Sequence, residues 1–111
     1  MTDDRAVEML SALSQTTRFK VFRMLMAAGD CGMAAGKIAD NLNVPQNTLS
    51  SHLSILSNAG LISVKREGRH LIYATDISET RTLIGFLVND CCNGNPEICS
   101  IAIPVKESAT A

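Results

Sequence analysis

The sequence predicts a mainly α-helical domain that carries one β-hairpin, and three observations lead to this fold class. Apolar residues recur at three- and four-residue intervals in several segments, as they do on one face of an amphipathic helix. Between residues 61 and 74 apolar and polar residues instead alternate on both sides of a glycine, which is typical of two paired strands. A chain of 111 residues with 46% hydrophobic content suits one modest core. We therefore expect a single domain over residues 1–100.

The first two helices are predicted from apolar stripes near the N-terminus. In the first helix, which Thr2 or Asp3 can cap, the stripe is formed by Ala6, Val7, Leu10 and Leu13. The second helix lies in the run TTRFKVFRMLMAAG, and its stripe is formed by Phe19, Phe22, Leu25 and Met26. We expect this second stripe to be core and Gly29 to end the helix in a left-handed conformation.

Two further helices follow, separated by a tight turn at the sequence NVP. The shorter one covers residues 34–42 and turns Ile38, Ala39 and Leu42 inward. The longer one begins at Pro45 or Gln46, where proline suits a first turn, and ends near Asn58 before Gly60. Its apolar positions are Leu49, Leu53 and Leu56, and its opposite side is polar but hardly charged.

The C-terminal third is predicted to hold the hairpin and a last helix. LISVK and RHLIYA are the two strands, and REG supplies the turn between them. Ser78 can cap a helix whose apolar stripe is formed by Leu83, Ile84, Leu87 and Val88. After Ile103 the chain loses its periodicity and ends in small and polar residues, so we expect residues 101–111 to be a disordered tail.

Charge and composition limit the classes of partner. The first ten residues carry two aspartates where a secretory signal needs basic and then apolar residues, and no apolar run approaches the roughly 20 residues of a membrane span, so we expect a cytoplasmic protein. The formal net charge of −1 alone argues against a nucleic-acid partner. However, Lys65, Arg66 and Arg69 lie close together, which makes the middle of the chain the candidate contact surface.

Two short helices joined by a tight turn and followed by a basic hairpin are typical of a winged helix-turn-helix. The second helix can enter the major groove of double-stranded DNA, because amides and hydroxyls both donate and accept hydrogen bonds at base edges. We predict that Gln46, Asn47 and Ser50 read bases. We predict that phosphate or sugar contacts are made by Thr48, Ser51 and His52. The hairpin residues Lys65, Arg66 and Arg69 would reach the backbone or the minor groove.

The runs LSQTTRFKVFRML and KIADNLNVPQNTLSSHLSILSNAGLISVKREGRHLIYA resemble the ArsR family of metalloregulatory repressors, and the resemblance covers about residues 5 to 92. It implies a homodimer whose first and last helices form the subunit interface. It also implies paired recognition helices that meet an imperfect palindrome in operator DNA, with half-sites about one helical turn apart.

A cluster of thiols indicates a second function. Cys91, Cys92 and Cys99 lie within nine residues, around an NGNPEI segment that favours a turn. Three thiolates that converge on one ion select soft acceptors, and arsenite and antimonite suit three sulfurs. Zinc fits less well because a structural zinc site normally has four protein ligands. Cys31 stands apart from other cysteines, and we expect it to be a packing or incidental residue.

Two metal-binding sites that are known in the ArsR family are absent from this sequence, and their absence limits where the sensor site can be. Many arsenic-responsive members carry a Cys-x-Cys pair in the first helix of the helix-turn-helix, where this sequence has Ala34 and Gly36. Zinc-responsive members use aspartate and histidine ligands on the last helix, whereas the histidines here are His52 and His70. The remaining pattern, CC-x6-C, resembles the arsenite-responsive subgroup with C-terminal cysteines. It predicts a repressor that leaves its operator when Cys91, Cys92 and Cys99 bind arsenite.

Several alternatives remain open at this stage. On the same fold, the ligand could be methylated trivalent arsenic, which uses two thiolates, or cadmium or lead, or the thiols could sense redox or persulfide state. A protein-interaction module that uses the fold without DNA is another reading. An enzyme built on the cysteines has little support, because there is no CxxC near a βαβ pattern, no phosphate-cradling loop and no histidine in the cysteine segment. We expect no enzyme and no organic cofactor.

Overall fold

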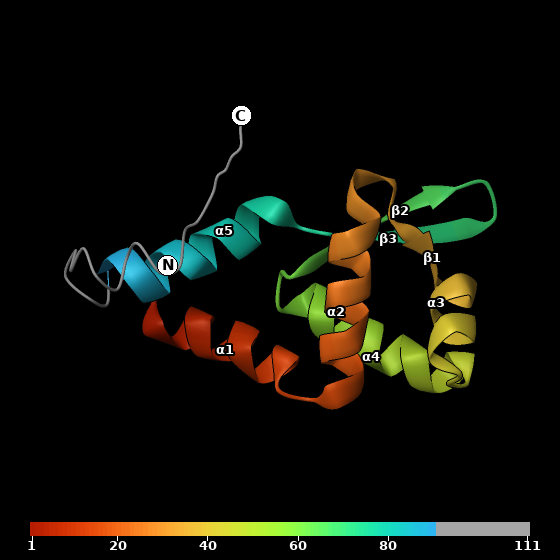
Figure 1. Ribbon diagram of the computed structural model, residues 1–111, viewed down its shortest axis with the longest axis horizontal. Coiled ribbons are helices and arrows are strands. Elements are labelled where there is room, and N and C mark those ends of the chain that lie inside the picture. The colour runs from red at the N-terminus through yellow and green to blue at the C-terminus, as the bar shows by residue number, and fades with distance from the viewer. Residues whose placement is uncertain (91–111) are drawn as a thin grey trace.

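The computed structural model describes residues 1–90, and it confirms the predicted class of a mainly α-helical domain with a β-hairpin (Figure 1). The helices are α1 (Asp3–Leu13), α2 (Thr16–Ala28), α3 (Ala35–Leu42), α4 (Gln46–Asn58) and α5 (Ile77–Gly85). A 3-10 turn, η1 (Gly29–Cys31), follows α2, and a π-helical turn, η2 (Phe86–Asp90), follows α5. The predicted boundary between domain and tail at residue 100 lies outside the described residues.

The sheet has three antiparallel strands in the order β1-β3-β2. Strand β2 (Ile62–Glu67) pairs with β3 (His70–Thr75), and Glu67 faces His70, so Gly68 and Arg69 form the turn rather than the predicted REG. Gly68 adopts φ 63°, which suits a two-residue hairpin turn. The third strand, β1 (Met33–Ala34), pairs with β3 and was not predicted, because two residues are too few to show an alternating pattern.

The core forms where α1, α2, α4 and the start of β2 meet. Leu49, Leu53 and Leu56 are buried, as their spacing predicted, and Leu56 is fully inaccessible to solvent. Other buried positions are Ala6, Met9, Ala12, Val21, Leu25, Ile38, Ala39, Ala59, Leu61, Ile62, Leu83 and Val88. No polar or charged residue is buried among residues 1–88. The free energy of folding of one chain therefore depends on apolar packing, much of it against α4.

The predicted core stripe of α2 is partly wrong. Phe19 is 48% exposed and Met26 is also exposed, whereas Leu25 of the same stripe is buried as predicted, together with Val21, which was not in the stripe. The α1 stripe divides in the same way, because Val7 is 62% exposed and Leu10 is exposed. Helical spacing identifies the apolar face of a helix but does not show which part of that face is covered by other elements. In α1 and α2 only some of the apolar side chains are covered by the core, and the others are exposed to solvent.

Glycine ends α4 as the sequence predicted. Gly60 adopts φ 85°, its N–H donates to the carbonyl of Ser57 at 3.0 Å, and the N–H of Leu61 donates to the carbonyl of Leu56 at 3.1 Å. This pair of hydrogen bonds is the Schellman arrangement, which satisfies the last carbonyls of a helix. It fixes the direction in which the chain leaves α4 for the hairpin.

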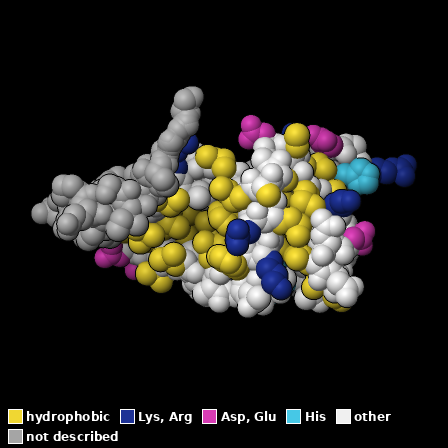
Figure 2. Space-filling model, viewed as in Figure 1, with side chains coloured by type: hydrophobic (Ala, Val, Ile, Leu, Met, Phe, Trp, Pro, Cys, Tyr) yellow, Lys and Arg dark blue, Asp and Glu magenta, His cyan; other side chains and the backbone are white. Residues whose placement is uncertain are grey.

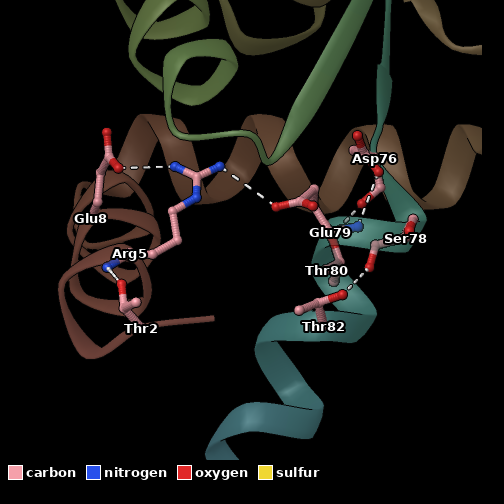
Figure 3. Close-up of polar contacts among 8 residues, drawn as sticks. All are labelled: Thr2, Arg5, Glu8, Asp76, Ser78, Glu79, Thr80 and Thr82. Atoms are coloured by element: carbon pink, nitrogen blue, oxygen red, sulfur yellow. Dashed lines mark hydrogen bonds and ion pairs between the residues drawn. The ribbon is translucent and has the colours of Figure 1, made fainter.

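The cap of α5 differs from the prediction. Asp76, not Ser78, is the N-cap, and its Oδ1 accepts a hydrogen bond from the N–H of Glu79 at 3.0 Å (Figure 3). Ser78 lies inside the first turn, where its carbonyl accepts a hydrogen bond from Thr82 Oγ1 at 3.0 Å. Both side chains are acceptable caps, and the end of β3 at Thr75 places Asp76 at the position that needs one.

Arg5 contacts α1, α5 and the residue that follows α4, and Figure 3 shows the first two of these contacts. Its guanidinium lies 2.9 Å from Glu8 on α1 and 3.6 Å from Glu79 on α5. The same group lies against Gly60, where a Cβ atom would collide with Arg5 Nη2. The end of α4 is therefore in contact with α1 and α5. None of the helices formed by the described residues is long and apolar enough to cross a membrane.

Candidate nucleic-acid interface

Helices α3 and α4 are joined by the tight turn that the sequence predicted. Asn43 adopts a left-handed conformation at φ 57° and ψ 45°, which asparagine tolerates better than most residues. The N–H of Val44 donates to the carbonyl of Ala39 at 3.1 Å, and Pro45 is the N-cap of α4. Two helices joined by so short a turn form a helix-turn-helix.

The polar face of α4 is exposed to solvent. Leu49 and Leu53 hold the opposite face of the helix in the core. The exposed side chains on α4 include five of the predicted DNA-binding residues, Gln46, Asn47, Thr48, Ser50 and Ser51. Their exposure is what base and phosphate contacts require, and their roles in DNA binding stay predictions.

His52 differs from the other predicted contact residues because it is half-buried. Its Nδ1 lies 3.4 Å from Nη1 of Arg18 at the start of α2, and Arg18 Nε donates to the carbonyl of Ala12 at 2.6 Å. Arg18 thus links the α1–α2 junction to the recognition helix. Sequence reasoning missed Arg18, since no local pattern connects two residues so far apart in the chain.

The hairpin carries its predicted basic residues on exposed positions. Lys65 Nζ lies 3.1 Å from Oε2 of Glu67, and both side chains are largely exposed, so this pair is worth at most about 1 kcal/mol. Arg66 and Arg69 form no ion pair within residues 1–90. These two guanidinium groups are therefore open to a phosphate.

The three predicted sensor residues, Cys91, Cys92 and Cys99, all lie outside the described residues. Cys31 is exposed in η1, so of the two expectations for it, packing in the core is wrong and an incidental role stays a prediction. Within residues 1–90 no group of three or more His, Cys, Asp or Glu side chains is placed to hold a metal ion.

Known proteins are similar to this chain in sequence and in fold. A helix-turn-helix domain family matches residues 13–65. The transcriptional repressor SdpR of Bacillus subtilis is 32% identical over 87 residues, which are 78% of this chain and 93% of SdpR. A protein assigned as the arsenical resistance operon repressor ArsR of Halobacterium salinarum is 32% identical over 78 residues, which are 70% of this chain and 60% of that protein.

Solved structures agree with the sequence relatives. An ArsR-like regulator from Rhodococcus sp. RHA1 has a TM-score of 0.72 at 22% identity and covers 88% of this chain and 90% of its own. Reduced HlyU from Vibrio cholerae N16961 has a TM-score of 0.63 at 27% identity, over 80% and 90% of the two chains. A homodimeric winged helix-turn-helix DNA-binding domain from Mycobacterium bovis has a TM-score of 0.62 at 22% identity, over 86% and 94%.

These matches bear on both fold and function. The structural likenesses confirm the winged helix-turn-helix fold, in which α3 and α4 are the two helices and the β2–β3 hairpin is the wing. The sequence relatives are DNA-binding transcriptional regulators and not enzymes. The chain belongs to the ArsR family of helix-turn-helix transcriptional regulators.

Proposed function

We propose that this regulator is a repressor that leaves its operator when arsenite, or antimonite, binds the thiolates of Cys91, Cys92 and Cys99. The observation that carries the proposal is the CC-x6-C pattern directly after η2. An all-sulfur donor set favours soft acceptors over oxygen-loving cations, and a reducing cytoplasm would keep the thiols free of disulfides. The relationship to the arsenical resistance repressor of Halobacterium salinarum supports the same ligand class.

The working form would be a homodimer joined through α1 and α5. Exposed apolar side chains lie on α1 at Val7 and Leu10, on α5 at Ile84, and in η2 at Leu87. Helices α1 and α5 meet at Arg5 and Glu79. Hydrophobic side chains also gather on the face shown in Figure 2. A second copy would remove such surface from water, and the Mycobacterium bovis neighbour is homodimeric.

A route from the cysteines to the recognition helix is available in the described contacts. Helix α5 leads through η2 into the cysteine segment, and Glu79 on α5 contacts Arg5, which lies against Gly60 at the end of α4. A ligand that draws the three thiolates together would change the position of α5. The two recognition helices of a dimer would then sit at a different spacing, with lower affinity for operator DNA.

A second candidate is a sensor of thiol redox or persulfide state on the same DNA-binding fold. It is favoured by the likeness to HlyU, for which a reduced form has been solved, and by the exposure of Cys31. In that case Cys31 would be a partner for one of the C-terminal thiols, and an oxidant rather than arsenite would release the DNA.

Fluorescence anisotropy on a labelled duplex from the region upstream of the chain's own coding sequence tests both candidates. We expect the reduced protein to bind, arsenite to release it, and excess dithiol to restore binding. Cys91→Ser, Cys92→Ser and Cys99→Ser should each bind DNA but resist arsenite, while Cys31→Ser, the matched control, should behave like the parent protein.

Three other results of this experiment would contradict the proposed arsenite site. Release that persists in all three single variants would remove the three-thiolate site. Release by arsenite that needs only two of the three cysteines would replace the three-thiolate site with a two-thiolate site, the number of thiolates that methylated trivalent arsenic uses. Release by mild oxidant that Cys31→Ser abolishes would establish the redox sensor instead.

A further inference from the structure

A hollow of about 430 Å³ lies between the start of α3, the start of α4 and the tip of the wing. Its lining includes Lys37 from α3, Gln46 from α4, and Arg69 and His70 from the wing. In Figure 2, His, Lys or Arg, and Asp or Glu side chains all lie at the right-hand end of the view. None of the residues that line the hollow carries a carboxylate, so its charge is positive.

The two cations of the hollow are uncompensated. Within residues 1–90 neither Lys37 nor Arg69 forms an ion pair, whereas Lys65 on the same hairpin is paired with Glu67. Asp40, one turn along α3 from Lys37, is also without an ion pair in this part of the chain. Two like charges from separate elements, facing one open space, form an environment that an anion would stabilise.

The hollow also adjoins a predicted base-reading residue. At Gly36 a Cβ atom would lie 3.1 Å from Nε2 of Gln46, so the Gln46 amide rests against the first turn of α3. An anion held by Lys37 and Arg69 would therefore be bound next to Gln46. The anion that is available beside a recognition helix in the major groove is a phosphodiester of the DNA backbone.

We propose that this hollow binds one backbone phosphate of each operator half-site, held jointly by Lys37 and Arg69, with the His70 ring as an additional hydrogen-bond donor. Lys37 and His70 are then DNA contacts that the sequence alone did not identify. The phosphate fixes the register of α4 in the groove and so determines which base Gln46 meets. This inference rests on the proposed DNA-binding function but not on the identity of the inducer.

The test is the salt dependence of binding to two duplexes, the chain's own upstream region and an unrelated sequence of equal length. Each phosphate contact contributes about 0.9 to the slope of log affinity against log salt, or about 3.5-fold in affinity between 50 and 200 mM. Lys37→Gln should weaken binding to both duplexes by the same factor, about threefold or more. Lys20→Gln, the same change on an exposed lysine of α2 that does not line the hollow, is the matched control and should have no effect.

A double variant tests whether one phosphate is shared. If Lys37 and Arg69 hold the same phosphate, Lys37→Gln with Arg69→Gln should lower the slope by about 0.9 for each bound protomer. A loss of about 1.8 for each protomer would mean two separate phosphates and would overturn the proposal. So would a Lys37→Gln variant that matches Lys20→Gln.

The variant Gly36→Ala distinguishes an effect on the position of Gln46 from an effect of removing a positive charge. The new methyl group would require the Gln46 amide to give way by a few tenths of an ångström, and no charge would change. We expect weaker binding to the upstream duplex and unchanged binding to the unrelated one, the opposite of the uniform loss from Lys37→Gln. Equal loss on both duplexes would contradict the placement of Gln46 beside the phosphate.

The outcomes also distinguish this inference from the proposed function. If the parent protein binds neither duplex, the DNA-binding function itself fails. If the parent binds and releases DNA with arsenite while Lys37→Gln matches Lys20→Gln, only the phosphate site fails.

Discussion

Replacement of Gly60 by alanine should uncouple the end of the recognition helix from α1 and α5. Gly60 occupies φ 85°, and a Cβ atom there would collide with Arg5 Nη2. The substitution therefore has two separable effects. It imposes a left-handed conformation on an alanine, and it displaces the guanidinium that connects α1 to Glu79 of α5.

The two effects can be given magnitudes. The left-handed conformation costs an alanine about 1–2 kcal/mol, offset by about 0.4–1 kcal/mol because alanine has fewer unfolded conformations than glycine. Displacement of Arg5 breaks its ion pairs with Glu8 at 2.9 Å and Glu79 at 3.6 Å, which are partly exposed and together contribute about 1 kcal/mol. Gly60→Ala should thus lower the free energy of unfolding by about 2 kcal/mol.

Gly68 provides a matched control for this substitution. It has φ 63°, and a Cβ atom there would meet nothing within 4 Å, so Gly68→Ala should cost only the backbone term of about 1 kcal/mol. The free energies are compared by urea denaturation followed by circular dichroism. All variants are measured at one protein concentration, because association of subunits adds to apparent stability.

A double-mutant cycle decides whether Arg5 is responsible for the difference. In an Arg5→Ala background no guanidinium opposes the new methyl group, so Gly60→Ala should cost about 1 kcal/mol instead of about 2. The coupling energy expected is therefore about 1 kcal/mol. If Gly60→Ala costs the same in both backgrounds, the contact between Arg5 and the end of α4 contributes nothing to stability, and the reasoning is refuted.

Three further predictions concern packing, capping and assembly. Leu56→Ala should lower the free energy of unfolding by about 2–5 kcal/mol because Leu56 is fully buried, whereas Ile55→Ala, one residue away and exposed, should cost less than about 1 kcal/mol in the same urea titration. Asp76→Ala should lower the free energy of unfolding by about 1 kcal/mol, because it removes the N-cap of α5, and Ser78→Ala should leave it almost unchanged. If thermal denaturation shows equal losses of stability for the two variants, the assignment of Asp76 rather than Ser78 as the N-cap is contradicted. Val7→Glu should shift a dimer to monomer in sedimentation velocity, and an unchanged sedimentation coefficient would argue against α1 as the subunit interface.

The recognition helix could be predicted from sequence because several local signals agree there. Leu49, Leu53 and Leu56 give its buried face, Pro45 its start and Gly60 its end, and all of these positions behave as predicted. The wing was predicted for the same reason, since its alternation of apolar and polar residues and its glycine turn are local features.

The features that could not be predicted depend on contacts between distant parts of the chain. Arg18 meets His52, and Arg5 meets Glu79, through the folded arrangement of helices, which leaves no periodic mark in the sequence. The exposure of Phe19 could not be read from spacing either, because spacing does not reveal which neighbour covers a face. The hollow beside Gln46 is likewise a product of three elements that are separate in sequence.

The two residues of β1 connect the helix-turn-helix to the wing, and this connection has a consequence for the DNA sites that the proposed complex can accept. Met33 pairs with Tyr73 and Ala34 with Ile72, so the start of the helix-turn-helix is hydrogen-bonded directly to the wing. In the proposed complex, α4 enters a groove and the wing touches the duplex, and this pairing would fix the offset between those two points within one protomer. Operators would then differ in their bases or in the distance between half-sites, while every half-site would present the two contact points at the same separation.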